Sequence, residues 1–251
     1  MPCTFTIEFE PDRSWKPIHR RLRGLAAALI EPDDNPDHYQ QEQPFTVGID
    51  QRRSSPELLV VRLNWLGDDL HEPVSRIADR VSHTHRLGST KLRCVDWTLS
   101  AQTYEELFNG LLRQMADLDF VTPTAFKRRG VSLPLPDPVQ VMQSLIRTWT
   151  ATAPKAVAID PAAIAKLQGG LAIVRHNVQT RRVEDGPGGQ PFVGFEGRVK
   201  LALVGEAADD HTALTMFGAL TAYATYAGVG RGTTYGFGMV NDRDVADLTN
   251  G

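Results

Sequence analysis

Residues 228–238 read Gly-Val-Gly-Arg-Gly-Thr-Thr-Tyr-Gly-Phe-Gly, so five of eleven consecutive residues are glycine. Glycine adopts positive φ angles at little cost and leaves neighbouring amide N–H groups uncovered. Successive uncovered amides form concave sites that bind anions such as phosphate. The stretch therefore predicts a phosphate-binding loop. The alternative interpretation is a glycine-rich helix end followed by a tight turn.

The segments on either side of the glycines narrow the choice of loop. Apolar residues spaced by three and four predict a helix over residues 211–226, and a short strand is predicted at residues 237–241. The dinucleotide-binding fingerprint has the opposite order, with its glycines after a strand and before a helix. No Gly-Lys-Ser or Gly-Lys-Thr follows, as it does in mononucleotide loops. The loop is therefore not one of the common nucleotide-binding loops.

The glycine-rich run resembles the C-terminal signature of the CRISPR-associated RAMP-superfamily endoribonucleases that process precursor CRISPR RNA. Two further segments resemble that family in the expected order: the block 120–126 with 134–138 and 145–149, and the run Phe-Val-Gly-Phe-Glu-Gly at residues 192–197. The resemblance spans most of the C-terminal half. The N-terminal half is similar only loosely, through Pro-Phe-Thr-Val at residues 44–47 after a His-containing loop. The resemblance to this family implies metal-independent cleavage of CRISPR repeat RNA.

Hydrophobic periodicity predicts the same order of elements twice along the chain: strand, helix, strand, strand, helix, strand. The first set is predicted at residues 3–10, 18–29, 44–49, 58–65, 69–79 and 91–99. The second set is predicted at residues 119–126, 138–149, 171–182, 192–204, 211–226 and 237–241. This order predicts an α+β fold of two tandem ferredoxin-like (RAMP/RRM-like) domains with antiparallel sheets.

The chain is predicted to divide near residue 118. Residues 1–118 form an N-terminal ferredoxin-like domain with a candidate catalytic loop, and residues 119–251 form a C-terminal one with a long hairpin and the Gly-rich RNA-binding loop. Residues 104–117 are predicted to be a connecting helix. A short helix is expected to begin at Asp160, with Asp as its N-cap and Pro just inside.

The net charge of −3 is unlike that of most nucleic-acid-binding domains. The local field steers a polyanion, however, and basic residues cluster at 19–23, 52–53, 127–129 and 181–182. The alternative is that each cluster is an ordinary solvated surface run. Which interpretation holds depends on whether the fold brings the clusters together.

Composition excludes several other classes of protein. Two cysteines are too few for a disulfide framework, and no cofactor or metal site is predicted because His83 and His85 lack a third ligand at suitable spacing. No apolar run is long enough for a membrane span or a signal sequence. We therefore expect a cytoplasmic protein with no membrane partner.

RNA cleavage without a metal requires three groups. A base removes the 2′-OH proton, a cation or N–H donors stabilise the charge on the phosphate, and an acid protonates the leaving 5′-oxygen. The products are a 2′,3′-cyclic phosphate and a 5′-hydroxyl. Histidine suits the base or acid role because its pKa lies near neutrality.

Three residues are candidates for catalysis. His38 is the first choice, because it lies in a polar loop ahead of Pro44, where many members of the resembled family carry their active histidine. His19 is the second choice, at the start of a helix beside Arg20 and Arg23. Tyr39 is the candidate hydrogen-bond donor. The alternatives are a solvated loop histidine, a plain helix residue and a core-anchoring tyrosine.

Candidate RNA-binding residues come from the Gly-rich loop and two basic clusters. We expect amides to hold phosphates, Arg231 to add charge and two threonines to add hydroxyl donors. Lys127 and Arg128 would neutralise the scissile phosphate or grip a duplex stem, and Arg181 and Arg182 would enter a groove of a stem-loop. The loop residues are Gly228, Gly230, Arg231, Gly232, Thr233, Thr234 and Gly236.

The sequence leaves two other functions open. One is a non-catalytic RAMP RNA-binding subunit of a CRISPR effector complex, and the other is a ferredoxin-like module that binds a small phosphorylated ligand. CRISPR repeat RNA is the expected partner in the preferred interpretation. The sequence does not decide whether the protein joins an effector complex or forms a homodimer.

Overall fold

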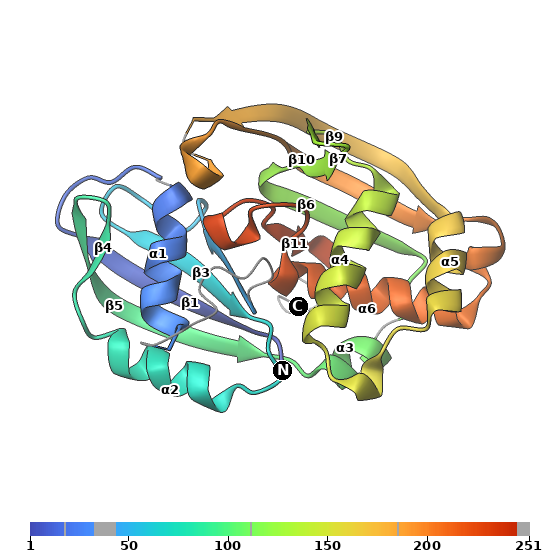
Figure 1. Cartoon of the computed structure of the whole chain (residues 1–251), viewed down its shortest axis with the longest axis horizontal. Helices are drawn as coiled ribbons and strands as arrows, with labels where there is room; N and C mark the ends of the chain where they lie inside the picture. The colour runs from blue at the N-terminus through green and yellow to red at the C-terminus, as the bar shows by residue number, and fades with distance from the viewer. Residues whose placement is uncertain (18, 33–43, 111, 185, 245–251) are drawn as a thin grey trace.

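Two antiparallel β-sheets lie side by side in the computed structural model (Figure 1). The structure describes residues 1–17, 19–32, 44–110, 112–184 and 186–244. Helices cover one face of each sheet, and the long strands β9 and β10 of the second sheet arch along the top of the view (Figure 1). The predicted α+β class with two ferredoxin-like sheets is confirmed.

The first sheet has the strand order β2-β3-β1-β5-β4. Alternate side chains of β1, namely Phe5, Ile7 and Phe9, are fully buried in one core with apolar residues of α1 such as Leu22 and Leu29. The elements are β1 (Cys3–Pro11), α1 (His19–Ile30), β2 (Phe45–Ile49), β3 (Leu59–Trp65), α2 (His71–Arg80), β4 (His85–Leu87) and β5 (Thr90–Ala101).

The second sheet has the order β11-β6-β10-β9. Four strands of the first sheet, β2-β3-β1-β5, follow the same plan, with the first strand of each unit between its third and fourth. The elements are β6 (Met115–Thr124), α4 (Pro138–Thr152), α5 (Pro161–Gly169), β9 (Leu171–Val183), β10 (Phe192–Leu203), α6 (His211–Ala227) and β11 (Val240–Asp242). Short 3-10 turns are η1 (Lys155–Val157), η2 (Pro187–Gly189), η3 (Gly205–Ala208) and η4 (Thr233–Tyr235).

Aspartate N-caps begin the three helices of the second unit. The side chains of Asp137, Asp160 and Asp210 accept hydrogen bonds from the amides of Gln140, Ala162 and Ala213. Each cap satisfies an amide that the first turn of a helix leaves without a partner. The predicted start of a helix at Asp160 is therefore confirmed.

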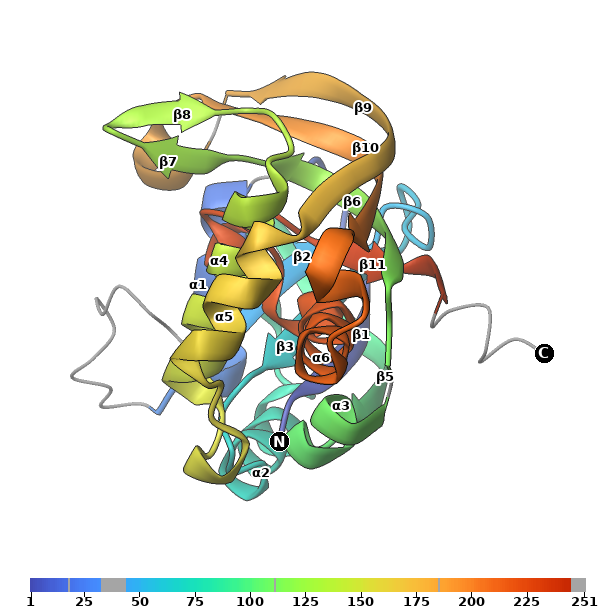
Figure 2. The ribbon, with the colours of Figure 1, turned by 90° about the vertical axis from the view of Figure 1, so that its right-hand side faces the viewer.

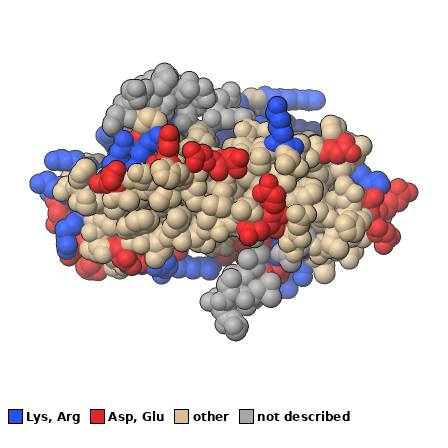
Figure 3. Space-filling model, turned by 90° about the horizontal axis from the view of Figure 1, so that it is seen from below, with Lys and Arg blue, Asp and Glu red and all other residues tan. Residues whose placement is uncertain are grey.

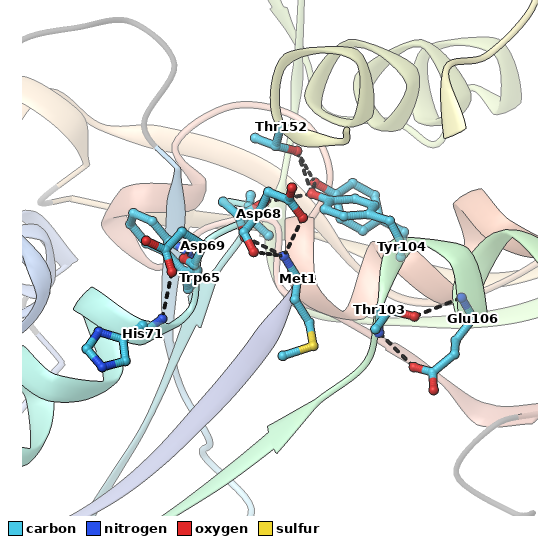
Figure 4. Close-up of polar contacts among 12 residues, drawn as sticks. Met1, Trp65, Asp68, Asp69, His71, Thr103, Tyr104, Glu106 and Thr152 are labelled. Carbon is cyan, nitrogen blue, oxygen red and sulfur yellow. Dashed lines mark hydrogen bonds and ion pairs between the residues drawn. The ribbon is translucent and has the colours of Figure 1, made fainter. Parts of the chain in front are cut away.

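The predicted connecting helix is wrong in its second half. Helix α3 (Tyr104–Gly110) begins with a capping box, in which Thr103 and Glu106 exchange hydrogen bonds of 2.7 and 3.0 Å (Figure 4). It ends at Gly110, and Met115 begins strand β6 instead. Residue 118 therefore lies within a strand, and the domain boundary there stays a prediction.

One hairpin was not predicted from the sequence. Strands β7 (Phe126–Arg128) and β8 (Val131–Leu133) pair with each other and project beside β9 and β10 (Figure 2). Arg129 and Gly130 form the turn with φ angles of +50° and +84°. The basic cluster at residues 127–129 therefore lies on a short projecting hairpin.

The two units are joined by polar contacts between strands β2 and β3 and the end of α6. Thr46 Oγ1 donates to the carbonyl of Tyr226 at 2.7 Å, and Asn64 Nδ2 donates to the same carbonyl at 3.0 Å. Arg62 donates to Asn241 Oδ1 at 2.6 Å. These bonds hold the edge of the first sheet against the start of the Gly-rich loop.

The face seen in Figure 3 carries no concentrated charge of either sign. Acidic and basic side chains are scattered between wide uncharged areas. Across the described residues, none of the helices combines the length and apolar character needed to cross a bilayer.

Candidate nucleic-acid interface

The Gly-rich loop follows α6 directly, and its backbone depends on glycine. Gly228 ends the helix with φ +63°, and Gly230, Gly232 and Gly236 have φ of +85°, +79° and +88°. These are left-handed conformations that residues with a Cβ rarely adopt. The glycines therefore permit the chain to turn repeatedly between α6 and β11.

The loop is held in place by the end of β6 and by α4. Arg231 N donates to the carbonyl of Ala125 at 3.1 Å, and Gly238 N donates to that of Pro123 at 3.1 Å. Gly230 N donates to Ser144 Oγ at 2.9 Å. The loop thus has a defined position against the second sheet.

These bonds correct part of the predicted phosphate site. The amides of Gly228 and Gly230 donate to Ala224 O and Ser144 Oγ, so they are already used within the protein. A Cβ at Gly230 would lie 2.6 Å from Ala125 O, which gives this glycine a packing role. Whether these two residues belong to the RNA site stays a prediction, but their amides are not the expected phosphate donors.

A groove of about 970 Å³ lies beside the loop, between α4, β7 and the residues around the start of β2. Among the described residues that line it, every charged side chain is basic: Lys127, Arg147 and Arg231. Hydroxyl groups add further donors. The hydroxyl-bearing residues are Thr46, Ser144, Thr148, Thr152, Thr233 and Thr234. Such a lining suits a polyanion.

Helix α4 contributes a polar stripe to this groove that sequence reasoning missed. Its members recur every three or four residues, as on one helical face. The other side of the helix is buried in the core, with Val141, Leu145 and Trp149 at most 1% exposed. That periodicity was the available signal for the stripe, which consists of Gln140, Gln143, Ser144, Arg147 and Thr148.

Buried tyrosines support the end of the groove formed by Leu66 and Thr152. Tyr104 donates to the carbonyl of Leu66 at 2.7 Å, and its hydroxyl lies 2.7 Å from Thr152 Oγ1 (Figure 4). Tyr223 OH lies 2.8 Å from the same Oγ1. Burial raises the pKa of both tyrosines, so both hydroxyls stay protonated and act as hydrogen-bonding groups.

Of the predicted catalytic residues, only His19 is described. It is 7% exposed, and its ring stacks on Phe237 with ring centroids 4.4 Å apart and an interplanar angle of 20°. Its Nδ1 lies 3.2 Å from the position that a Cβ on Gly236 would occupy. Among the described residues that line the groove His19 is not found, so the geometry favours packing over contact with substrate.

His38 and Tyr39 lie outside the described residues, and their predicted roles stay predictions. Pro44, which is the first described residue after that segment, lines the groove. A chain of six residues spans at most about 20 Å when extended. Covalent connection thus limits how far His38 can be from the groove.

The structure separates the other predicted cations into two groups. Lys127 lines the groove, whereas Arg128, the next residue on β7, does not. Arg181 is paired with Glu196 at 3.1 Å, and Arg182 is paired with Glu184 at 2.7 Å. Neither of these arginines lines the groove, so the four basic clusters do not converge on it.

Arg23 links α1 to the loop at Thr234. Its Nη1 donates to Thr234 Oγ1 at 3.1 Å, and its guanidinium lies 5.6 Å from the ring centroid of Tyr235. Thr233 and Thr234 both line the groove, and their role in binding RNA stays a prediction. Within the described part of the chain, no three His, Cys, Asp or Glu side chains gather as metal ligands do.

Comparison with known proteins gives consistent results for sequence and structure. Residues 118–240 match the family model of the CRISPR-associated endoribonuclease Cas6. No match was found among curated protein sequences.

Three solved structures illustrate the structural similarity. The product complex of a Thermus thermophilus Cas6 protein has a TM-score of 0.83 and 27% identity, over 96% of this chain and 100% of that one. The product complex of another Cas6 protein has a TM-score of 0.81 and 25% identity, over 97% and 100%. A Cas6-related protein from Pyrococcus furiosus shares the fold, with a TM-score of 0.54 and 12% identity over 96% and 98%.

The matched residues include β7, α4 and the Gly-rich loop, which supply most of the residues that line the groove. Together with the structural similarity over nearly the whole chain, this match shows that the protein is similar to the Cas6 family of CRISPR-associated endoribonucleases.

Proposed function

We propose that this protein cuts CRISPR repeat RNA within the precursor transcript and so releases guide RNAs. The observation that carries the proposal is the groove, whose charged lining residues among those described are all basic. The similarity to the Cas6 family suggests the reaction class, and the two most similar structures cited above are product complexes of Cas6 proteins. A groove with this charge suits an RNA backbone.

The proposed chemistry is attack of the 2′-hydroxyl on the adjacent phosphorus, without a metal ion. His38 acts as general base or general acid, with Tyr39 as its hydrogen-bond donor. Lys127, Arg147 and Arg231 neutralise backbone phosphates along the groove. The products carry a 2′,3′-cyclic phosphate and a 5′-hydroxyl. A positioned acid or base of this kind contributes about 10²- to 10⁴-fold in rate.

The test uses end-labelled repeat RNA from the neighbouring array, incubated with protein in EDTA. We expect one defined cut and a cyclic phosphate on the upstream fragment. His38→Ala should abolish cutting and leave RNA affinity nearly unchanged. His211→Ala is the matched control, because His211 is an exposed histidine at the start of α6, away from the groove.

The other outcomes separate the alternatives. Cutting that requires an added divalent ion would overturn the metal-independent mechanism. Unchanged cutting by His38→Ala would remove His38 from it, and His19→Ala, tested beside it, would then report on the second candidate. Tight binding without cutting would favour the non-catalytic RNA-binding subunit. Size-exclusion chromatography with and without RNA would report on the homodimer.

A further inference from the structure

Four side chains form a continuous stack from α1 to the groove. The rings of His19 and Phe237 have centroids 4.4 Å apart, and those of Phe237 and Phe192 are 4.0 Å apart with an interplanar angle of 16°. The Arg231 guanidinium carbon lies 5.2 Å from the centroid of Phe192. We call these residues the Arg231 stack. It joins α1, the start of β10 and two positions of the Gly-rich loop.

The two ends of the Arg231 stack have different environments. Phe192 and Phe237 are each 1% exposed, and His19 is buried as well. Arg231 is exposed and lines the groove. Within the described part of the chain no acidic side chain forms an ion pair with Arg231. The face of Phe192 is thus a contact that orients the guanidinium without neutralising its charge.

We infer that Phe192 is a positioning residue, which holds the Arg231 guanidinium over the groove to receive an RNA phosphate. This inference rests on the proposed function for its ligand. A guanidinium over an aromatic face is attracted by the negative charge density of the ring. An arginine that is already oriented loses less side-chain entropy when it binds phosphate. Phe192 therefore acts through Arg231 and not through contact with RNA.

The rest of the Arg231 stack explains how Phe192 keeps its place. Phe237 stacks on Phe192, and His19 stacks on Phe237 in turn. Gly236 lets α1 approach this closely, because a Cβ there would lie 2.6 Å from Leu22 Cδ1. The tip of the β9–β10 hairpin also contacts α1. The position of one groove cation thus depends on packing between the two units.

A double-mutant cycle on RNA binding tests the inference. The variants are Phe192→Leu, Arg231→Ala and the double variant, with uncleavable 2′-deoxy repeat RNA as the ligand. We expect each single change to weaken binding by about three- to tenfold. The double variant should bind no more weakly than Arg231→Ala alone, because Phe192 has no cation left to position. Arg231→Ala should also lower the slope of log affinity against log salt by about 1.

Phe195→Leu is the matched control. Phe195 is a fully buried aromatic residue on the same strand, and its ring contacts are Phe120 and Phe126 instead of a cation. It reports what the loss of a core ring does to affinity through stability alone. An effect of Phe192→Leu that matches the control, or that multiplies with that of Arg231→Ala, would overturn the positioning role.

A second measurement needs no RNA. In the NMR spectrum of the free protein, the ring current of Phe192 should move the Arg231 Nε–H proton resonance upfield, and Phe192→Leu should remove that displacement. Wild-type protein that binds no repeat RNA would overturn the proposed function, while the NMR result still decides whether Phe192 orients Arg231. An Arg231 resonance that is the same in wild type and Phe192→Leu would overturn the inference itself.

Discussion

The amide of Gly230 donates a hydrogen bond to Ser144 Oγ, and this bond joins the Gly-rich loop to helix α4 beside the groove. Ser144 is 6% exposed, and both residues line the groove. The loop and the helix therefore depend on one another for their positions. A glycine-rich loop that the sequence suggested as a free set of amides is instead fixed in part by a helix hydroxyl.

Ser144→Ala should lower the free energy of unfolding by about 1–2 kcal/mol, because it leaves the Gly230 amide without its acceptor. RNA affinity should fall as well, since the loop loses its tie to α4. Urea titration and RNA-binding isotherms measure the two effects. Thr215→Ala is the control, because it removes a helix hydroxyl on α6 that bonds only to His211 O. Equal losses for both variants would contradict the special role of Ser144.

Gly236→Ala should destabilise the loop by about 2 kcal/mol, because the residue has φ +88° and its Cβ would lie 2.6 Å from Leu22 Cδ1. Gly24→Ala is the opposite case. Gly24 lies within α1, and nothing is found within 4 Å of its Cβ position, so alanine should stabilise the protein by up to about 1 kcal/mol. Thermal unfolding of both variants measures these changes in stability. A neutral Gly236→Ala would show that the loop is not packed against α1.

Lys127→Ala should weaken RNA binding across all sequences and lower the salt slope by about 1, as loss of one phosphate contact does. Lys166→Ala is the matched control, because Lys166 lies on α5, is paired with Asp210 and is not part of the groove lining. Its salt slope should equal that of the wild type. A Lys127→Ala slope that also equals the wild-type slope would place the RNA elsewhere.

Asp117 should make the protein more stable near neutral pH than in acid. Hydrogen bonds from Arg198, including one of 2.7 Å from Nε, lower the pKa of its carboxyl in the folded state. A carboxyl with a lowered folded pKa stabilises the fold at pH values above its unfolded pKa of about 3.9. That stabilisation is lost as the pH falls through the folded pKa.

Asp117→Asn should therefore cost about 1 kcal/mol at pH 7. The difference from wild type should shrink as the pH falls below about 4, because Asp117 then takes up a proton first in the unfolded chain and, at still lower pH, in the folded protein. Urea titrations at pH 7 and pH 3 measure this difference in the free energy of unfolding. A difference that is the same at both pH values would show that Asp117 and Arg198 interact without an effect of charge.

Local sequence predicted most elements because their signals lie within a few residues. The Asp160-Pro161 pair predicted the start of α5, and alternation predicted β1 and β5. The second half of the helix predicted over residues 104–117 is wrong because Met115 and Asp117 pair with Ala202 and Lys200 of β10. Such pairing depends on a strand far along the chain, which a local pattern does not report.

Part of the candidate site was also predictable, because the signals for its residues lie within short segments of the sequence. Lys127, Arg231, Thr233 and Thr234, which the sequence suggested as RNA-binding residues, line the groove, and their contact with RNA stays a prediction. Arg147 was missed because a polar stripe on a helix resembles a solvated face. Arg181 was expected to bind RNA, but it forms an ion pair with Glu196 on the neighbouring strand.

The groove takes its walls from both units: Pro44, Thr46 and Leu66 come from the first, and α4 with the Gly-rich loop comes from the second. A molecule seated there touches both at once and acts as a non-covalent crosslink between them. Amide hydrogens of β2 and of α4 should then exchange more slowly together when the groove is filled. Occupancy of the groove would thus slow amide exchange in the backbones of both units.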